Sequence, residues 1–151
     1  MKKTNKGFSM VELIIVIAIM AILAGALAPA LIKYINKSRI STDISNGQQI
    51  ASGIQTALSN EAAYDDAADT SGAVTYGAFL TAQGTNMKKE LTSVIGNIGN
   101  SKAKKDVSGT QVSQQTYYVE MKAAQNLITV YVGTADANHM VYPSVGKSWS
   151  N

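Results

Sequence analysis

The chain has 151 residues, a formal net charge of +3 and no cysteine. Its length suits one domain beside one membrane segment, and the lack of cysteine excludes disulfides, thiolate catalysis and a lipidated cysteine anchor. Lys2, Lys3 and Lys6 account for the whole excess of positive charge, so the charge balance is no argument for a nucleic-acid partner.

An apolar stretch dominates the N-terminal region. No charged residue occurs from Leu13 to Ile32, and a helix of that length spans about 30 Å, the thickness of a bilayer core. Glu12 lies at the start of this stretch. An uncompensated acid at the bilayer centre costs about 2.5–3.5 kcal/mol, and less near a helix end. Glu12 therefore needs either a positive partner or a place among the headgroups.

Three interpretations of the N-terminus are open at this point. A secretory signal peptide would explain the basic start, but the apolar run is longer than usual and Pro29 follows the Ala-x-Ala sequence at 26–28 directly. A plain single-pass anchor explains the length but not Glu12. Cleavage before the apolar run, after Gly7, would leave the hydrophobic helix on the mature protein.

The sequence Lys6-Gly7-Phe8-Ser9-Met10-Val11-Glu12-Leu13 favours the third interpretation. It resembles the class III signal of the prepilin family, which comprises type IV pilins and pseudopilins, and the absence of cysteine is similar to Gram-positive-type pilins. The resemblance implies that a prepilin peptidase cuts after Gly7 and methylates the new N-terminus at Phe8. It also implies that Glu12 pairs with the Phe8 amine of a neighbouring subunit during assembly.

A weak point is predicted within the apolar helix. Pro29 cannot donate a backbone N–H, and its ring crowds the carbonyl of Gly25. We therefore expect a kink between Gly25 and Pro29, or a segment there that can lose helicity.

The helix is expected to continue beyond the apolar stretch. Apolar residues recur at helical spacing at Ile40, Ile44, Ala51, Ile54 and Leu58. This pattern predicts one helix from about Phe8 to Ser59, with polar residues, Asp43 among them, on the other positions. The expected organisation is a leader at 1–7, a transmembrane and fibre-core helix at 8–35, an amphipathic helix half at 36–59 and a globular α/β domain at 60–151.

The remaining elements point to an α+β fold. Residues 60–75 are predicted to be a polar loop, and two short helices are expected at about 76–82 and 86–96. Segments rich in β-branched and aromatic residues predict strands at 116–121, 127–132 and 139–142, with 107–113 a weaker candidate. The expected architecture is a long helical spine packed on a small antiparallel sheet, as in type IV pilins.

The sequence offers little for catalysis or ligand binding. His139 is the single histidine, and Gly146-Lys147-Ser148 lacks the upstream glycine of a phosphate-binding loop. The aspartates at 65, 66 and 69 lack the spacing of a calcium loop. Lys102, Lys104 and Lys105 are expected in a solvated loop. We predict no catalytic residue, no metal site and no cofactor.

The leading hypothesis is therefore a structural subunit of a type IV pilus, a surface fibre for adhesion, twitching motility or biofilm formation. The alternatives are a pseudopilin of a type II secretion-like machine, a DNA-binding or adhesive minor pilin, and a membrane-tethered enzyme. The expected partners are further copies of the chain, the prepilin peptidase and the pilus assembly platform with its ATPase. The precursor is expected in the cell membrane and the assembled subunit at the cell surface, with nucleic acid not expected as a partner.

Overall fold

The computed structural model describes residues 7–96, 98–112 and 114–150. The chain divides into two compact units, Met1–Ile35 and Asn36–Asn151. We call the second unit the head.

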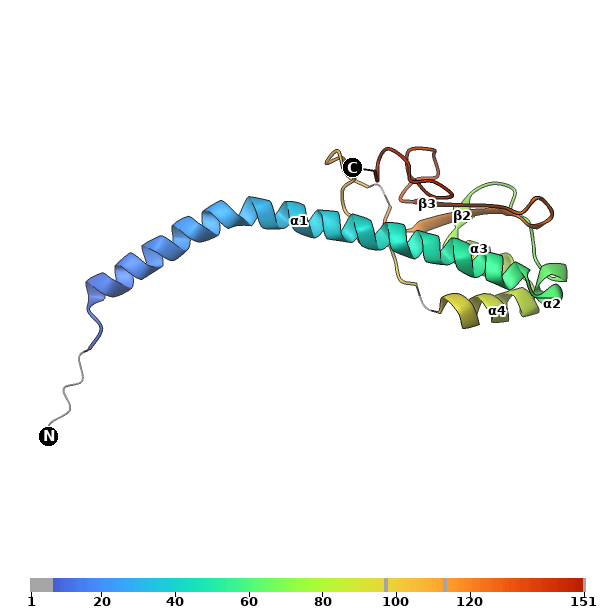
Figure 1. Cartoon of the computed structure of the whole chain (residues 1–151), viewed down its shortest axis with the longest axis horizontal. Coiled ribbons are helices and arrows are strands. Elements are labelled where there is room, and N and C mark those ends of the chain that lie inside the picture. The colour runs from blue at the N-terminus through green and yellow to red at the C-terminus, as the bar shows by residue number, and fades with distance from the viewer. Residues whose placement is uncertain (1–6, 97, 113, 151) are drawn as a thin grey trace, which may run out of the picture. The chain divides into compact units, whose positions relative to one another are not determined.

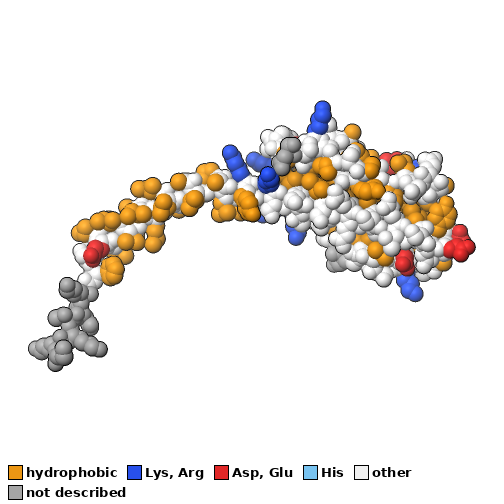
Figure 2. Space-filling model, viewed as in Figure 1, with side chains coloured by type: hydrophobic (Ala, Val, Ile, Leu, Met, Phe, Trp, Pro, Cys, Tyr) orange, Lys and Arg blue, Asp and Glu red, His pale blue; other side chains and the backbone are white. Residues whose placement is uncertain are grey.

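One long helix, α1, runs from Met10 to Leu58. The predicted helix from Phe8 to Ser59 is thus confirmed to within two residues at each end. Pro29 lies inside α1, and the helix continues through it. Every residue from Gly7 to Ile35 is exposed, whereas from Ile40 onward one face of α1 is buried. Figure 2 shows the hydrophobic side chains along the first part of the helix.

The sheet of the head has four antiparallel strands in the order β1-β2-β3-β4. They are β1 (Val74–Thr75), β2 (Tyr117–Lys122), β3 (Leu127–Val132) and β4 (Met140–Tyr142). The β2–β3 ladder pairs Tyr117 with Val132 and Lys122 with Leu127. The 3-10 turn Ala123–Gln125 and Asn126, which has a φ of 50°, connect these strands. The expected α+β architecture with a small antiparallel sheet is confirmed.

Three short helices complete the head: α2 (Glu61–Asp65), α3 (Tyr76–Ala82) and α4 (Thr85–Ile95). The predicted polar loop at 60–75 is wrong in part, because it contains α2 and β1. The side chain of Asn60 accepts a hydrogen bond from the amide of Ala63 at 3.3 Å, which caps α2 and allows a helix to form. Within the described residues of 107–113 the structure forms no strand, and Lys105 pairs with Gln111 as an isolated bridge.

Two glycines of α1 allow the backbone of this helix to lie close to the rest of the head. A Cβ atom added at Gly47 would overlap the side chain of Val141, and one added at Gly53 would overlap Ile95. The glycines therefore let α1 lie against the sheet on one side and against α4 on the other (Figure 1). The core between these elements contains buried aliphatic and aromatic side chains, among them Ile50, Ile54, Phe79, Leu91 and Val130.

Asp43 is fully buried on this same face of α1. The expectation that it lies on the polar face is wrong. Its carboxylate accepts hydrogen bonds from Ser101 Oγ at 2.8 Å, from the amides of Lys102 and Ala103 at 2.9 and 2.7 Å, and from Tyr117 Oη at 2.9 Å. These donors replace water around the charge, which makes burial of a carboxylate tolerable.

The Asp43 contacts join three parts of the head. Asp43 belongs to α1, Tyr117 begins β2, and residues 101–103 lie in the loop between α4 and β2. Asn46, one turn further along α1, donates from Nδ2 to Tyr117 Oη at 3.1 Å. Burial raises the pKa of the Tyr117 hydroxyl, and the charge of Asp43 adds to the increase although the Asn46 hydrogen bond opposes it. Tyr117 therefore stays protonated and donates to Asp43.

Replacing Asp43 with alanine should destabilise the head strongly. The substitution leaves the amides of residues 102 and 103 and two hydroxyl groups without their acceptor, and each unsatisfied buried donor costs about 1–3 kcal/mol. We expect the free energy of unfolding to fall by about 3 kcal/mol or more, measured by denaturant titration of the full chain in detergent. Asp65→Ala, at an exposed position of α2, is the control and should change it by less than about 0.5 kcal/mol. Equal stability of the two variants would contradict the role of Asp43.

Gly53→Ala should also destabilise the head, although alanine favours helices over glycine by about 1 kcal/mol. The reason is the overlap of the new methyl group with Ile95, and overpacking of this kind costs about 1–3 kcal/mol. The matched control is Gly77→Ala in α3, where an added Cβ meets no atom within 4 Å. Thermal unfolding should show a lower midpoint for the first variant and an unchanged or higher midpoint for the second.

Candidate assembly site at the start of the long helix

The predicted cleavage and pairing residues lie together at the start of α1. Gly7 and Phe8 precede the helix, and Glu12 lies in its first turn. Phe8 is 85% exposed, so its side chain packs on nothing in the isolated chain. A Cβ added at Gly7 would meet no atom within 4 Å. The fold of this chain therefore gives no steric reason for a glycine at position 7.

Ser9 and Glu12 form a capping box. The amide of Ser9 donates to Glu12 Oε2 at 2.9 Å, and the amide of Val11 donates to Ser9 Oγ at 3.3 Å. The first helical hydrogen bond runs from the amide of Leu13 to the carbonyl of Ser9 at 3.2 Å. Ser9 is thus the N-cap residue and Glu12 the third residue of the helix, an arrangement that satisfies amides with no partner inside the helix.

The capping box fixes the direction of the Glu12 carboxylate. The side chain turns back toward the amide of Ser9, which is the residue directly after Phe8. A negative charge at this end of the helix is also favoured by the helix dipole. The capping role of Ser9 was not among the predictions from the sequence, although Ser-x-x-Glu before an apolar run is the signature that predicts a capping box.

Gly25 and Pro29 lie further along α1, away from the capping box. Both are within continuous helix, and an added Cβ at Gly25 would meet no atom within 4 Å. Pro29 has no amide hydrogen to donate to the carbonyl of Gly25, so this turn of the helix lacks one backbone hydrogen bond. The weakness at this point, and any loss of helicity there, stays a prediction.

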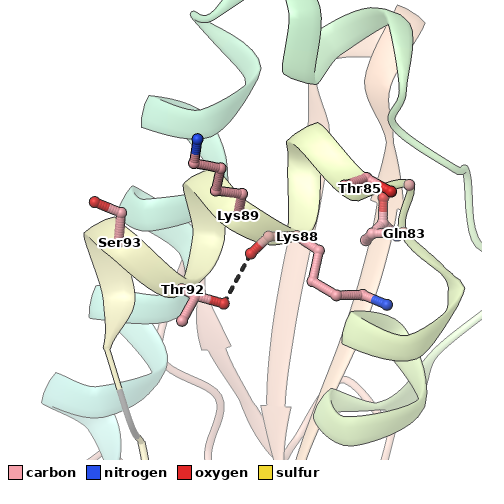
Figure 3. A pocket seen from close by; sticks show the side chains of 7 residues that line it. Gln83, Thr85, Lys88, Lys89, Thr92 and Ser93 are labelled. Carbon is pink, nitrogen blue, oxygen red and sulfur yellow. Dashed lines mark hydrogen bonds between the residues drawn. The ribbon is translucent and has the colours of Figure 1, made fainter.

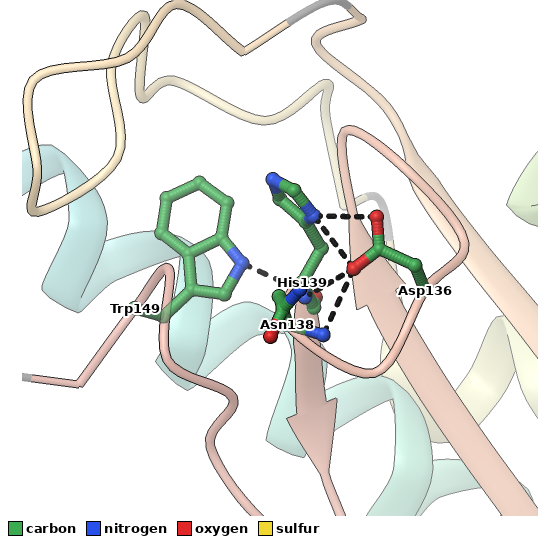
Figure 4. A network of polar contacts seen from close by, with 4 residues as sticks. All are labelled: Asp136, Asn138, His139 and Trp149. Carbon is green, nitrogen blue, oxygen red and sulfur yellow. Dashed lines mark hydrogen bonds and ion pairs between the residues drawn. The ribbon is translucent and has the colours of Figure 1, made fainter.

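The single histidine lies in a turn of the head and pairs with Asp136. His139 Nδ1 lies 2.9 Å from both carboxylate oxygens of Asp136, and the amides of Asn138 and His139 also donate to Asp136 Oδ1 (Figure 4). The indole nitrogen of Trp149 donates to the carbonyl of His139 at 3.1 Å, and the two rings meet edge to face. These contacts fasten the C-terminal segment to β4.

A shallow, open pocket lies along α4, lined by Gln83, Gly84, Thr85, Lys88, Lys89, Thr92 and Ser93. Figure 3 shows that Lys88 and Lys89 extend in different directions. The hydroxyl of Thr92 donates to the carbonyl of Lys88 at 2.8 Å and so belongs to the helix itself. A ligand site usually has a few polar groups that point to a common centre. The two lysines of this pocket do not do so (Figure 3).

The remaining candidates for chemistry make structural contacts. Asp66 Oδ2 accepts from the amide of Asn86 at 2.6 Å, and Asp69 Oδ1 accepts from the amide of Ala123 at 2.7 Å. Within the described residues, no group of three or more histidine, aspartate and glutamate side chains is placed to hold a metal ion.

Comparison with known proteins gives two findings. Residues 2–28 match the prokaryotic N-terminal methylation motif, a range that includes Gly7, Phe8, Glu12 and Gly25. Two sequences of the type IV major fimbrial protein FimA from Dichelobacter nodosus are each 41% identical to this chain over 58 residues. The aligned residues are 38% of this chain and 37% and 36% of those proteins, so the match covers little more than a third of the relatives' length. No solved structure matches at the same level of significance.

The head should lose stability in acid. Burial opposes ionisation of Asp106 and Asp136, but hydrogen bonds from Ser108 and Thr110 to the first, and from His139 and Asn138 to the second, outweigh it and lower both pKa values. A carboxyl group with a lowered pKa in the folded state contributes stability above its unfolded pKa of about 3.9, and this contribution disappears as the pH falls through the folded value.

We therefore expect the free energy of unfolding to decrease as the pH is lowered from about 5 to below 4. Asp106→Asn should reduce this pH dependence, because the variant has one carboxylate fewer to protonate. The measurement is denaturant unfolding at several pH values, with Asp65→Asn as the control. An Asp106→Asn curve parallel to that of the unmodified chain would show that Asp106 contributes nothing to acid sensitivity.

Proposed function

We propose that this chain is a structural subunit of a type IV pilus. The single observation that carries the proposal is the capping box, which holds the Glu12 carboxylate at the start of an exposed apolar helix, next to the Gly7–Phe8 bond. The methylation-motif match and the similarity to FimA support it. The role is structural and not catalytic.

Cleavage of the Gly7–Phe8 bond by a prepilin peptidase is the first proposed step. Hydrolysis leaves a carboxylate on Gly7 and an amino group on Phe8, which is protonated at neutral pH. Methylation of this nitrogen keeps its positive charge. An added Cβ at Gly7 would meet no atom within 4 Å in the chain's own fold. The role of the glycine in this proposal is therefore access for the peptidase, since glycine brings no side chain into the peptidase cleft.

Charge pairing in the fibre is the second step. Glu12 Oε2 accepts the hydrogen bond from Ser9, and Oε1 has no recorded partner among the described residues. The Phe8 amine of a neighbouring subunit can bind there without breaking the cap. In an apolar bundle of helices, an unpaired charge penalises every other axial alignment, so this pair fixes register as well as adding stability.

In this proposal the apolar part of α1 lies first in the membrane and later in the core of the fibre. By length and composition α1 can cross a membrane, and its side chains from Gly7 to Ile35 are exposed in the isolated chain. The precursor would store this segment in the cell membrane. Polymerisation would then transfer it to the fibre core, where residues 8–35 pack on other copies, and the assembled subunit would lie at the cell surface.

The other parts of the chain follow from the same proposal. Residues 1–7 are the leader, 36–59 connect the fibre core to the sheet, and 60–151 form the outer surface for adhesion, motility or biofilm formation. The turn between Gly25 and Pro29 can extend during assembly. The assembly platform and its ATPase supply the work of extraction from the membrane.

Glu12→Gln should be cleaved normally but assemble poorly. Glutamine keeps a carbonyl oxygen that can accept from the Ser9 amide, so the variant removes the charge and preserves the cap. We expect sheared surface filaments to fall by at least about tenfold, corresponding to loss of about 1.4 kcal/mol of pairing energy. Gly7→Ala is the comparison variant for the cleavage step, and we expect it to accumulate as uncut precursor.

Mass spectrometry of the mature chain supplies the second readout. An N-methylated Phe8 at the N-terminus is expected for both the unmodified chain and Glu12→Gln. A mature chain that begins at Met1, or after Pro29, would refute the cleavage site. Normal filaments from Glu12→Gln would refute charge pairing. A methylated chain absent from sheared filaments would instead favour the pseudopilin of a secretion machine.

A further inference from the structure

We propose that a basic surface on the head binds anionic phospholipid headgroups while the apolar helix is in the membrane. The surface consists of Lys37 and Arg39 on α1 and of Lys102, Lys104 and Lys105 in the loop between α4 and β2; we call it the basic collar. This inference rests on the membrane-inserted stage of the proposed function and adds a ligand for the head at that stage.

Two contacts bring the loop lysines beside the start of the head. The amide of Lys102 donates to the buried Asp43, and the side chain of Asn36 donates to the carbonyl of Lys105 at 3.2 Å. Residues 36 and 43 are two helical turns apart and so lie on the same side of α1. The backbone of the loop is thus held on α1 at residues 102 and 105, along the part of the helix that includes Lys37 and Arg39. The three lysines are exposed in a loop, as the sequence predicts, and the two contacts hold the backbone of that loop on α1.

The collar carries positive charge without exposed acidic neighbours. The nearest acidic residues in the same segments, Asp43 and Asp106, are buried. Asp43 accepts hydrogen bonds from the loop between α4 and β2, and Asp106 accepts from Ser108 and Thr110 of that same loop. Among the described residues, none of the five collar side chains forms an ion pair or a side-chain hydrogen bond. In the view of Figure 2, the Lys and Arg side chains where α1 enters the head have no acidic side chain beside them.

The position of the collar in the sequence, just after the apolar run, favours a membrane surface as its ligand. The uncharged run ends at Ile32, and Lys33 is the first charged residue after it. Lys37 lies one helical turn beyond Lys33, so the collar begins close to the end of the apolar run. The attachment points from residue 36 to residue 43 span roughly 10 Å of helix, which is about one Debye length at an ionic strength of about 0.1 M. Each basic residue this close to an anionic surface contributes about 1 kcal/mol of attraction.

Other polyanions fit the collar less well. The head carries equal numbers of basic and acidic residues, so it lacks the overall field that attracts nucleic acid. Tyr117 of β2 is buried and offers no surface on which a base could stack. A second copy of the chain would have to present a negative surface, but the acidic side chains of α2 and α4 share their part of the head with Lys88 and Lys89.

The test uses the full chain reconstituted in vesicles, with one cysteine introduced for a fluorescent label because the natural chain has none. Val107→Cys places the label two residues after Lys105, at an exposed position. Ala62→Cys places it on α2, beyond the other end of α1 and roughly 30 Å along the helix from Lys37. Lipids with a quencher on the headgroup then report how close each label lies to the membrane surface.

We expect quenching at position 107, but not at 62, to increase when phosphatidylglycerol replaces part of the phosphatidylcholine, and to decrease again with added salt. Lys104→Gln with Lys105→Gln should lower the ratio of docked to undocked heads by about thirtyfold, a factor of about five for each charge. Lys88→Gln with Lys89→Gln makes the same change of charge on α4 and should leave docking intact.

Equal quenching at 107 in neutral and anionic vesicles would overturn the proposal, and so would equal effects of the two lysine pairs. Collar-dependent binding of duplex DNA in detergent, without collar-dependent docking on vesicles, would overturn it in favour of nucleic acid. Flotation of the chain with the vesicles checks insertion separately. A chain that does not insert contradicts the membrane stage of the proposed function, whereas an inserted chain with an undocked collar contradicts the lipid proposal alone.

Discussion

The buried carboxylate of Asp43 is the interaction on which the organisation of the head depends. It lies on the face of α1 that packs against the core, where an unpaired charge would be prohibitive. Donors from Tyr117 and from residues 101–103 make its burial possible. The same bonds fix the loop between α4 and β2 against α1, so one charge specifies how helix, strand and loop meet. The basic collar exists because this loop is fastened.

The two acidic residues of α1, Glu12 and Asp43, differ in where the groups that balance their negative charge come from. Asp43 finds all its donors within the folded chain, and its charge is therefore satisfied before any assembly. Within the part of the chain that the structure describes, Glu12 accepts one hydrogen bond, from the Ser9 amide of its own capping box. In the proposed pilus the missing partner is created by cleavage and comes from another subunit. Internal pairing thus stabilises the head, whereas in the proposed pilus external pairing joins one subunit to the next.

The glycines of α1 show a similar division. Gly47 and Gly53 permit close packing on Val141 and Ile95, and a methyl group at either position would overlap a side chain of the head. Gly25 has open space around it in the single chain. Its small size can matter for contacts between apolar helices, where small residues let backbones approach. Residues that look alike in the sequence therefore differ in whether their neighbours belong to the same chain.

The sequence by itself determined the extent of α1, the two main strands and the position of the candidate assembly site. These depend on local patterns: an uncharged run, helical spacing of apolar residues, β-branched segments and the Gly-Phe-Ser-x-x-Glu order. Only the tertiary structure decided that Asp43 is buried, that the loop lysines join Lys37 and Arg39, and that residues 60–75 contain a helix and a strand. Periodicity assigns a polar residue to the surface because it cannot anticipate donors supplied by Tyr117 and Ser101, which are 74 and 58 residues away in the chain.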